Sequence, residues 1–279
     1  MVLFFSSSLA RKALKTRRPE SHKGENGRVL VVGGSSRYAG APALAGLASL
    51  HSGADLAYVV APSVVSSTIA GFSPDLIVQR FEGDFLNEGG VAAFSELAPG
   101  ADALVLGNGL GKNPKALSCA QKILSLWSKP AVVDGDALGF VSNLKNKGVI
   151  YTPHMGEFAR MGFSLSGSSI EAIGRVARNA ARSLGGVVLL KGPVDIISDG
   201  ERVAFNKTGN ASMTVGGTGD VLAGLAGGFL SQGHSAFNAA CLAAFVNGSA
   251  GDLAFKEVGY SLLASNLLRF IPRVLKRIR

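Results

Sequence analysis

Apolar segments of strand length alternate with helical sequence along most of the chain, and this alternation constrains the fold more than any other feature of the sequence. The segments RVLVVGG at 28–34, LAYVVAP at 56–62 and VVLL at 187–190 are apolar nearly throughout. Strands without a polar face are typical of a parallel sheet with helices on both sides. We therefore predict an α/β fold with a mostly parallel central sheet covered by helices on both faces.

The length and composition fit a single large domain. Of the 279 residues, 47% are hydrophobic and 17% are charged, which favours a sizeable core over a disordered chain. Because no linker-like stretch interrupts the alternation, we predict one domain at 27–279 after a lead-in segment at 1–26. The most apolar long segment, AFNAACLAAFVNGSAGDLAF, is broken by Asn238, Asn247 and Asp252, and the N-terminus lacks the order of a secretory signal. We expect a cytoplasmic protein with no membrane segment.

The chain is basic, with a formal net charge of +9. Much of the excess lies in two terminal stretches, RKALKTRRPESHK at 11–23 and RFIPRVLKRIR at 269–279. Because no aromatic stacking pattern or nucleic-acid motif accompanies them, we interpret both as solvated surface and expect no nucleic-acid partner. Cys119 and Cys241 lie far apart, which favours two buried free thiols, and the four histidines are too scattered to suggest a zinc site.

Glycine-rich or polar turns follow several of the predicted strands. They read GGSSRYAGA, GNGLG, DGDAL, TPHMGE and LKGPVD in chain order. Open α/β sheets bind ligands beyond the carboxyl ends of their strands, so these turns are expected to line one ligand-binding edge. Neither the G-x-G-x-x-G dinucleotide fingerprint nor a P-loop occurs in the required frame, which means that any phosphate is bound by another architecture.

The stretch GGTGDVLAG at 216–224 predicts an anion site. Its glycines precede the apolar run of a buried helix, and such a turn points free backbone N–H groups outward at the positive end of the helix dipole. Asp220 fits this place either as the helix N-cap or as a base for a substrate hydroxyl, and spacing alone does not separate the two. In either role, we expect the helix dipole to lower its pKa.

Polar residues in the other turns leave similar pairs of interpretations open. His154 fits a hydrogen-bonded loop histidine or a ligand contact, and Glu157 fits a helix cap or a magnesium site reached through water. Lys191 ends an apolar strand, where it either reaches outward to solvent or meets a phosphate. Asp134 and Asp136 either serve a ligand or turn the chain.

Six segments in a fixed order resemble one known family. They are GRVLVVGGSSRYAGAPALAGLASLHSGADL, GNGLG, VVDGDAL, YTPHMGEFARM, VLLKG and GGTGDVLAG. This set resembles the ribokinase-like fold and, within it, the ADP- or ATP-dependent NAD(P)H-hydrate dehydratases, over about residues 24–272. Asn108 stands where that family usually has proline, and from this difference we expect a looser turn.

The resemblance implies a repair reaction. The S epimer of hydrated NADH or NADPH (NADHX or NADPHX) is phosphorylated on its C6 hydroxyl, and elimination restores NAD(P)H with release of AMP and phosphate. It implies that Asp220 is the catalytic base and that backbone amides of the anion site stabilise the transferred charge. The implied contacts to the hydrate are Ala41, Gly109, His154 and Asp220; those to the adenine nucleotide and its phosphates are Lys191, Gly192, Pro193, Val194, Asp195, Gly217, Thr218 and Gly219.

The resemblance also implies cofactors and partners. Mg²⁺ would bridge the phosphates of ADP or ATP, with ADP preferred, and Glu157 would reach the metal through water. A separate epimerase protein would supply the S epimer, and the enzyme would be a homo-oligomer, a tetramer by resemblance. The nearest alternative is a kinase of the same fold that phosphorylates a small vitamin-precursor alcohol. A nucleotide-binding regulator without catalysis is a more distant one.

Overall fold

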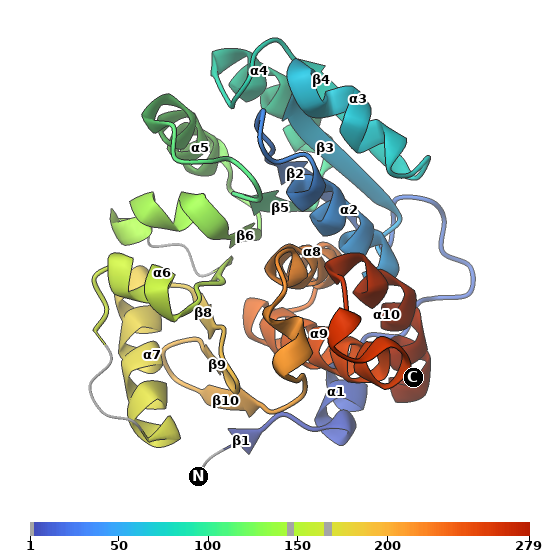
Figure 1. Ribbon diagram of the computed structural model, residues 1–279, viewed down its shortest axis with the longest axis vertical. Coiled ribbons are helices and arrows are strands. Elements are labelled where there is room, and N and C mark those ends of the chain that lie inside the picture. Colours follow the sequence, from blue (N-terminus) through green and yellow to red (C-terminus); the bar gives the residue numbers. More distant parts are fainter. Residues whose placement is uncertain (1–2, 144–147, 165–168) are drawn as a thin grey trace.

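A ten-stranded sheet forms the centre of the computed structural model, which describes residues 3–143, 148–164 and 169–279 (Figure 1). The strand order is β1-β10-β9-β8-β7-β6-β5-β2-β3-β4, and all neighbouring strands from β8 to β4 run parallel, as predicted. The strands are β1 (Leu3–Phe4), β2 (Arg28–Val32), β3 (Leu56–Pro62), β4 (Leu76–Phe81), β5 (Ala103–Leu106), β6 (Ala131–Val133), β7 (Val149–Tyr151), β8 (Val187–Leu190), β9 (Asp195–Ser198) and β10 (Val203–Asn206).

Helices cover both faces of the sheet, which confirms the predicted layers. One face packs against α1 (Ser7–Ala13), α2 (Gly40–Ser52), α3 (Ser63–Gly71), α8 (Thr218–Ser231), α9 (Ala236–Val258) and α10 (Ala264–Ile278). The other packs against α4 (Glu88–Leu97), α5 (Pro114–Leu126), α6 (Met155–Arg160) and α7 (Ile170–Leu184). Short 3₁₀ helices are η1 (Ala98–Gly100), η2 (Gly135–Asn143), η3 (Ala211–Thr214) and η4 (Gly259–Ser261).

Alternate residues of each central strand enter different cores, which explains why the strands are apolar throughout. In β2, Val29 and Val31 belong to the core beneath α2, α8 and α9, whereas Leu30 and Val32 belong to the core beneath α4 and α5. A strand buried on both faces therefore has no position where a polar side chain would reach water.

A glycine in the motif GGTGDVLAG lets two helices pack at very short range. A Cβ atom at Gly224 of α8 would overlap the carbonyl oxygen of Ala45 in α2. Helix α8 is buried on nearly all sides from Val221 to Ser231, as expected for a helix that lies inside an α/β layer. Gly224 thus serves helix packing, whereas the earlier glycines of the motif lie at the site described below.

The N-terminal segment packs onto the main body of the fold beside the β9–β10 pair. Within the predicted lead-in segment, β1 pairs in parallel with β10, and Phe5 and Ala10 are buried in the core. Strands β9 and β10 form an antiparallel hairpin, with Gly200 in the left-handed region (φ +90°) of its turn. Both cysteines are buried free thiols, as predicted.

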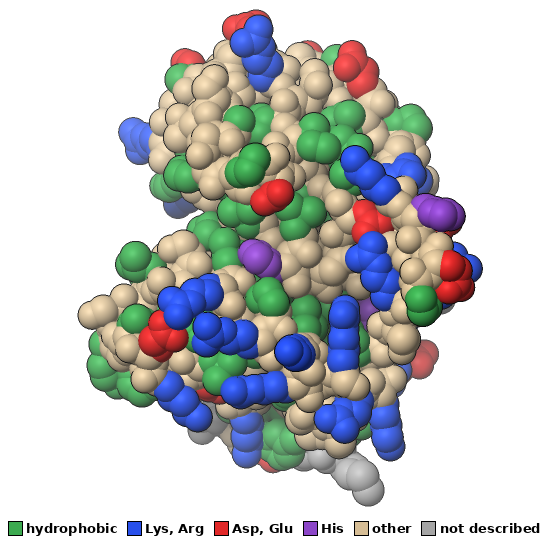
Figure 2. Space-filling view, turned by 90° about the vertical axis from the view of Figure 1, so that its right-hand side faces the viewer, with side chains coloured by type: hydrophobic (Ala, Val, Ile, Leu, Met, Phe, Trp, Pro, Cys, Tyr) green, Lys and Arg blue, Asp and Glu red, His purple; other side chains and the backbone are tan. Residues whose placement is uncertain are grey.

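Basic side chains gather on the side of the molecule where α10 lies (Figure 2). The charged residues of α10 are exposed, and Arg269 and Arg273 approach Glu257 at 2.6 and 4.0 Å. Within the described ranges, no helix has both the length and the apolar character needed to cross a bilayer.

Candidate active site

Three strand ends bring a lysine, a threonine and two carboxylates together at the carboxyl edge of the sheet. Lys191 follows β8, and its Nζ donates at 3.0 Å to Oδ1 of Asp134, the residue that directly follows β6. Thr152, after β7, donates to the same oxygen at 2.7 Å. Glu157 Oε2 lies 3.8 Å from Lys191 Nζ. The parallel register of β6, β7 and β8 places these residues side by side although they are far apart in sequence.

Lys191 remains within the site and does not extend into solvent, because only 19% of its side chain is exposed. Burial lowers its pKa, but the nearby carboxylates, led by Asp134, outweigh this effect and hold the pKa above its ordinary value. A lysine that is charged and largely enclosed is suited to meet a phosphate.

The stretch that is predicted to bind an anion forms the N-terminus of α8. Its N-cap is Gly217, whose φ of +98° favours glycine, and no side chain caps the helix. The first N–H groups of a helix have no partner within the helix, so those of the first turn are directed out of the N-terminus. A Cβ atom at Gly219 would lie 3.3 Å from Lys191 Nζ, which shows how closely the lysine approaches this turn.

Asp220 lies in the first turn of α8 but does not cap it. Its Oδ1 accepts a hydrogen bond from Nδ2 of Asn108 at 2.7 Å. Burial, and after it the negative charge of Asp134, raise the pKa of Asp220 to about 6, although the hydrogen bond from Asn108 lowers it. The N-cap interpretation is therefore wrong, and so is the expectation of a lowered pKa. Burial and the charge of Asp134 outweigh the hydrogen bond from Asn108 and the charge of Lys191.

Asn108 belongs to the predicted turn GNGLG, but it was not itself predicted as a site residue. Its side chain is 1% exposed, and its Nδ2 also donates to Asp134 Oδ2 at 3.1 Å. Its carbonyl accepts from the N–H of Gly34 at 2.9 Å, so both the backbone and the side chain are held. The expected looser turn is thus wrong, because the asparagine makes bonds that a proline side chain could not make.

A cavity of about 590 Å³ opens beside the anion site. Most of the predicted nucleotide residues line it, namely Lys191, Gly192, Pro193, Asp195, Thr218 and Gly219. Val194 instead packs against the core beneath α7. Asp195 accepts from Gly192 N and Asn206 Nδ2, and burial raises its pKa to about 6.

The far wall of this cavity was not predicted. It comes from the loop after β10, from η3 and from α9, with Thr208, Gly209, Asn210, Ala211, Met213, Thr214, Asn247 and Gly248. Asn247 is nearly buried in α9, and its Nδ2 donates to Thr218 O at 3.4 Å. The segment KTGNASMT at 207–214, which supplies most of this wall, carries no motif of a ligand site.

His154 and Glu157 together cap α6. The Nδ1 atom of His154 accepts from the N–H groups of Gly156 and Glu157 at 3.0 and 3.2 Å, and Glu157 Oε2 accepts from His154 N at 2.8 Å. This is a reciprocal capping box with histidine in the place of the usual hydroxyl residue. His154 also lines the cavity with its side chain 54% exposed, so the ring can contact a ligand as well.

Ala41 and Gly109 lie together on the α2 side of Asn108. A Cβ atom at Gly109 would come 3.2 Å from the Cβ of Ala41 and 2.8 Å from that of Tyr38. Gly109 also has a φ of +72°, and its carbonyl accepts from Ser35 Oγ at 2.8 Å. The two residues therefore lie next to the turn that holds Asn108 but outside the lining of the 590 Å³ cavity.

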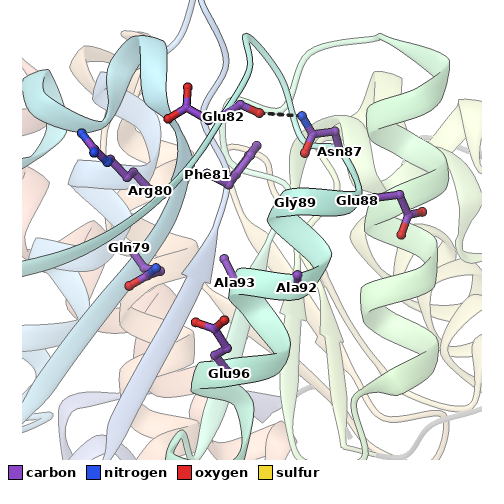
Figure 3. Close-up of a pocket in the computed structure, with 10 residues that line it drawn as sticks. All are labelled: Gln79, Arg80, Phe81, Glu82, Asn87, Glu88, Gly89, Ala92, Ala93 and Glu96. Atoms are coloured by element: carbon purple, nitrogen blue, oxygen red, sulfur yellow. Dashed lines mark hydrogen bonds between the residues drawn. The ribbon is translucent and has the colours of Figure 1, made fainter.

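A depression of about 680 Å³ lies at the outer edge of the sheet, between β4 and α4 (Figure 3). Its carboxylates are Glu82, Glu88 and Glu96, and Asn87 Nδ2 donates to the carbonyl oxygen of Glu82 at 2.8 Å. It contains none of the predicted site residues, so we assign the site to the carboxyl edge.

The mostly parallel strand order, with helices on both faces, defines an α/β protein of ribokinase-like type. A ribokinase-like superfamily protein from Enterococcus faecalis has a similar structure, with a TM-score of 0.86, 25% identity, and coverage of 99% of this chain and 96% of that one. The family model for NAD(P)H-hydrate dehydratase matches residues 29–273, and the chain belongs to this family.

Individual relatives agree with the family. The ADP-dependent (S)-NAD(P)H-hydrate dehydratase of Cenarchaeum symbiosum is 37% identical over 270 residues, covering 95% of this chain and 94% of the relative. The bifunctional NAD(P)H-hydrate repair enzyme Nnr of Pyrobaculum aerophilum is 43% identical over 265 residues, and the chain spans 53% of its length. The ADP/ATP-dependent NAD(P)H-hydrate dehydratase of Bacillus subtilis, co-crystallised with ATP and Mg²⁺, has a TM-score of 0.85 at 28% identity and covers 100% and 99% of the two chains.

Proposed function

We propose that this chain uses ADP to dehydrate the S epimer of NADHX or NADPHX, restoring NADH or NADPH and releasing AMP and phosphate. The observation that carries the proposal is the placement of Asp220 between the anion site of α8 and the bridging amide of Asn108, with Lys191 at its side. The family of the chain and the name of the Cenarchaeum relative support the choice of substrate and nucleotide.

In the proposed reaction, the carboxylate of Asp220 accepts the proton of the C6 hydroxyl while that oxygen forms a bond to the terminal phosphorus of ADP. The bond between this phosphorus and AMP breaks, and AMP leaves. The phosphorylated intermediate then loses phosphate from C6 and a proton from C5, which restores the ring double bond. N–H groups of Gly217, Thr218 and Gly219 and the ammonium group of Lys191 stabilise the charge on the transferred phosphoryl group.

The acidity of Asp220 suits this role. A carboxyl with a pKa of about 6 is mostly ionised near neutral pH and is a stronger base than an ordinary aspartate. Its environment therefore supports proton transfer, whereas an N-cap would only need a hydrogen-bond acceptor.

The donor groups of the site also fit magnesium. Among residues 3–143, 148–164 and 169–279, no group of three or more His, Cys, Asp or Glu side chains is arranged to hold a metal directly. Mg²⁺ commonly keeps several water ligands and binds through one or two carboxylates and substrate phosphates. Glu157 lies 3.8 Å from Lys191, which lines the cavity, and would reach the ion through water. When bound, the ion supplies positive charge that neutralises the phosphates.

We further propose that the cavity of about 590 Å³ takes the adenine nucleotide and that the hydrate reaches Asp220 from the side of Ala41, Gly109 and His154. The crystallisation of the Bacillus relative with ATP and Mg²⁺ supports a nucleotide site in this fold. A homotetrameric, cytoplasmic enzyme that depends on an epimerase for the S epimer completes the proposal.

Incubation of the purified chain with NADHX, ADP and Mg²⁺ tests the function. We expect the dihydronicotinamide absorbance to return, with AMP and phosphate formed in step with it and the R epimer left over. If the hydrate is untouched while a vitamin-precursor alcohol is converted to a stable phosphate ester, the protein is a kinase and the proposal fails.

A further inference from the structure

Asn108 occupies a rigid position at the centre of the site. It lies just beyond β5, between two glycines in the left-handed region, Gly107 at φ +123° and Gly109 at φ +72°. Its carbonyl is fixed by the N–H of Gly34, and its side chain is almost fully buried. A side chain held in this way has little freedom to turn away from its partners.

The carboxamide of Asn108 links two carboxylates that come from different elements. Its Nδ2 donates to Asp220 Oδ1 at 2.7 Å and to Asp134 Oδ2 at 3.1 Å, which uses both of its hydrogens. Asp134 has two further donors, Thr152 and Lys191. In the part of the chain that the structure describes, Asn108 is the one side chain that donates to the carboxylate of Asp220.

The oxygen of the same carboxamide is buried and has no hydrogen-bond partner among the residues that the structure describes. Leaving a buried acceptor unpaired is unfavourable, so the orientation of this group costs stability unless a ligand or water meets it. A functional role would explain an asparagine at this position, because its N–H groups donate to the carboxylate of Asp220, the proposed base.

We infer that Asn108 is a positioning residue that orients the carboxylate of Asp220 toward the substrate hydroxyl and offsets its repulsion by Asp134. This inference rests on the proposed function. The charged groups around Asp220 are Asp134 after β6 and Lys191 after β8, with Glu157 of α6 beyond the lysine. Because Asn108 is neutral, it stabilises the ionised carboxylate by a hydrogen bond and does not form an ion pair with it, as a further cation beside Lys191 would.

Removal of this amide should disturb the base and spare the nucleotide site, because Asn108 does not line the 590 Å³ cavity. A hydrogen bond to a charged group contributes about 1.5–3 kcal/mol, which corresponds to about 1–2 pKa units. For Asn108→Ala, we therefore expect the pKa of Asp220 to rise from about 6 by about 1–2 units, and kcat/KM at about pH 7 to fall by roughly 2–10-fold through loss of the ionised base. The KM for ADP should stay at the wild-type value.

The test follows the carboxyl directly by NMR of protein labelled with ¹³C at the aspartate carboxyl carbons, with the Asp220 signal assigned by its absence in Asp220→Asn. The pH titration is compared with the acid limb of kcat/KM in wild type, Asn108→Ala and the near-isosteric Asn108→Asp. Asn87→Ala is the matched control, since this asparagine caps α4 and also donates to a carbonyl outside the site.

Upward shifts of the NMR titration and of the acid limb in both Asn108 variants, with neither shift in Asn87→Ala, are the expected result. A titration that stays near the wild-type pKa in Asn108→Asp, or in a folded Asn108→Ala, overturns the inference. Because the NMR readout needs no turnover, a wild-type chain that fails to act on NADHX defeats the proposed function alone.

Discussion

Asp220 is subject to two opposing demands, because its carboxyl is buried beside Asp134 while the proposed reaction needs it ionised. Since its folded pKa is about 6, kcat/KM should fall as the pH drops through about 6 and the base becomes protonated. Asp195 has a similar pKa in the 590 Å³ cavity, so Asp195→Asn is the control. We expect the acid limb to persist in that variant when kcat/KM is measured against pH. Loss of the limb would assign it to Asp195.

The raised pKa of Asp220 also affects stability. The folded protein keeps a proton that the unfolded chain releases, so this group makes the free energy of unfolding fall as the pH rises from about 4 to about 6. Above that window, ionised Asp220 is a cost to the fold. A residue that lowers the stability of the fold in the pH range where it is active is characteristic of a functional site.

Among the helices, α2 and α8 approach so closely that glycine is required at their contact. Gly224→Ala places a methyl group against the Ala45 carbonyl, and overpacking of this kind costs about 1–3 kcal/mol. Gly40→Ala is the matched control, because a Cβ atom at Gly40 would meet nothing within 4 Å. Chemical denaturation should show the loss in the first variant and none in the second, and equal stabilities would contradict the packing argument.

The cap of α6 separates the structural role of His154 from its proposed role in binding. His154→Ala should lower stability by about 0.5–2 kcal/mol through loss of the cap, whereas His154→Asn should restore much of it. If the ring also contacts the hydrate, the KM for NADHX stays raised in both variants. Thermal melts and steady-state kinetics of the two proteins distinguish these effects, and a normal KM in His154→Asn would leave His154 as a cap alone.

Across the whole molecule, the layered architecture was predictable because strands buried on both faces leave a continuous apolar signal. The same signal placed the turns that gather at the carboxyl edge. The motif GGTGDVLAG predicted a helix that begins after its glycines, because free N–H groups at a helix start follow from local geometry; anion binding there stays a prediction.

Contacts between segments that are far apart in the chain could not be predicted from the sequence. Asn108 meets Asp220 across 112 positions of the chain, and this contact depends on how β5 and α8 are placed. The pKa of Asp220 differs from the expectation because burial and the charge of Asp134 raise it, and both depend on the tertiary fold. The capping box at His154 could have been recognised from its spacing to Glu157, had histidine been considered as a capping residue.

The preference for ADP over ATP is a property that we expect at the scale of the whole molecule. The relative from Cenarchaeum symbiosum, which this chain matches over 94% of its length, is named ADP-dependent. We therefore expect kcat/KM to be higher with ADP than with ATP when both are assayed with the same hydrate and Mg²⁺. A clear advantage for ATP would contradict this expectation without affecting the role of Asp220.

The most direct test of the central claim measures kcat and the melting temperature of Asp220→Asn beside the wild type. Because asparagine removes a buried charge and keeps an acceptor for Asn108, the melting temperature at neutral pH should be equal or higher. Turnover of NADHX with ADP should fall by roughly 10²–10⁴, the usual contribution of a positioned acid–base group. A folded Asp220→Asn protein that keeps near-normal turnover would contradict the account.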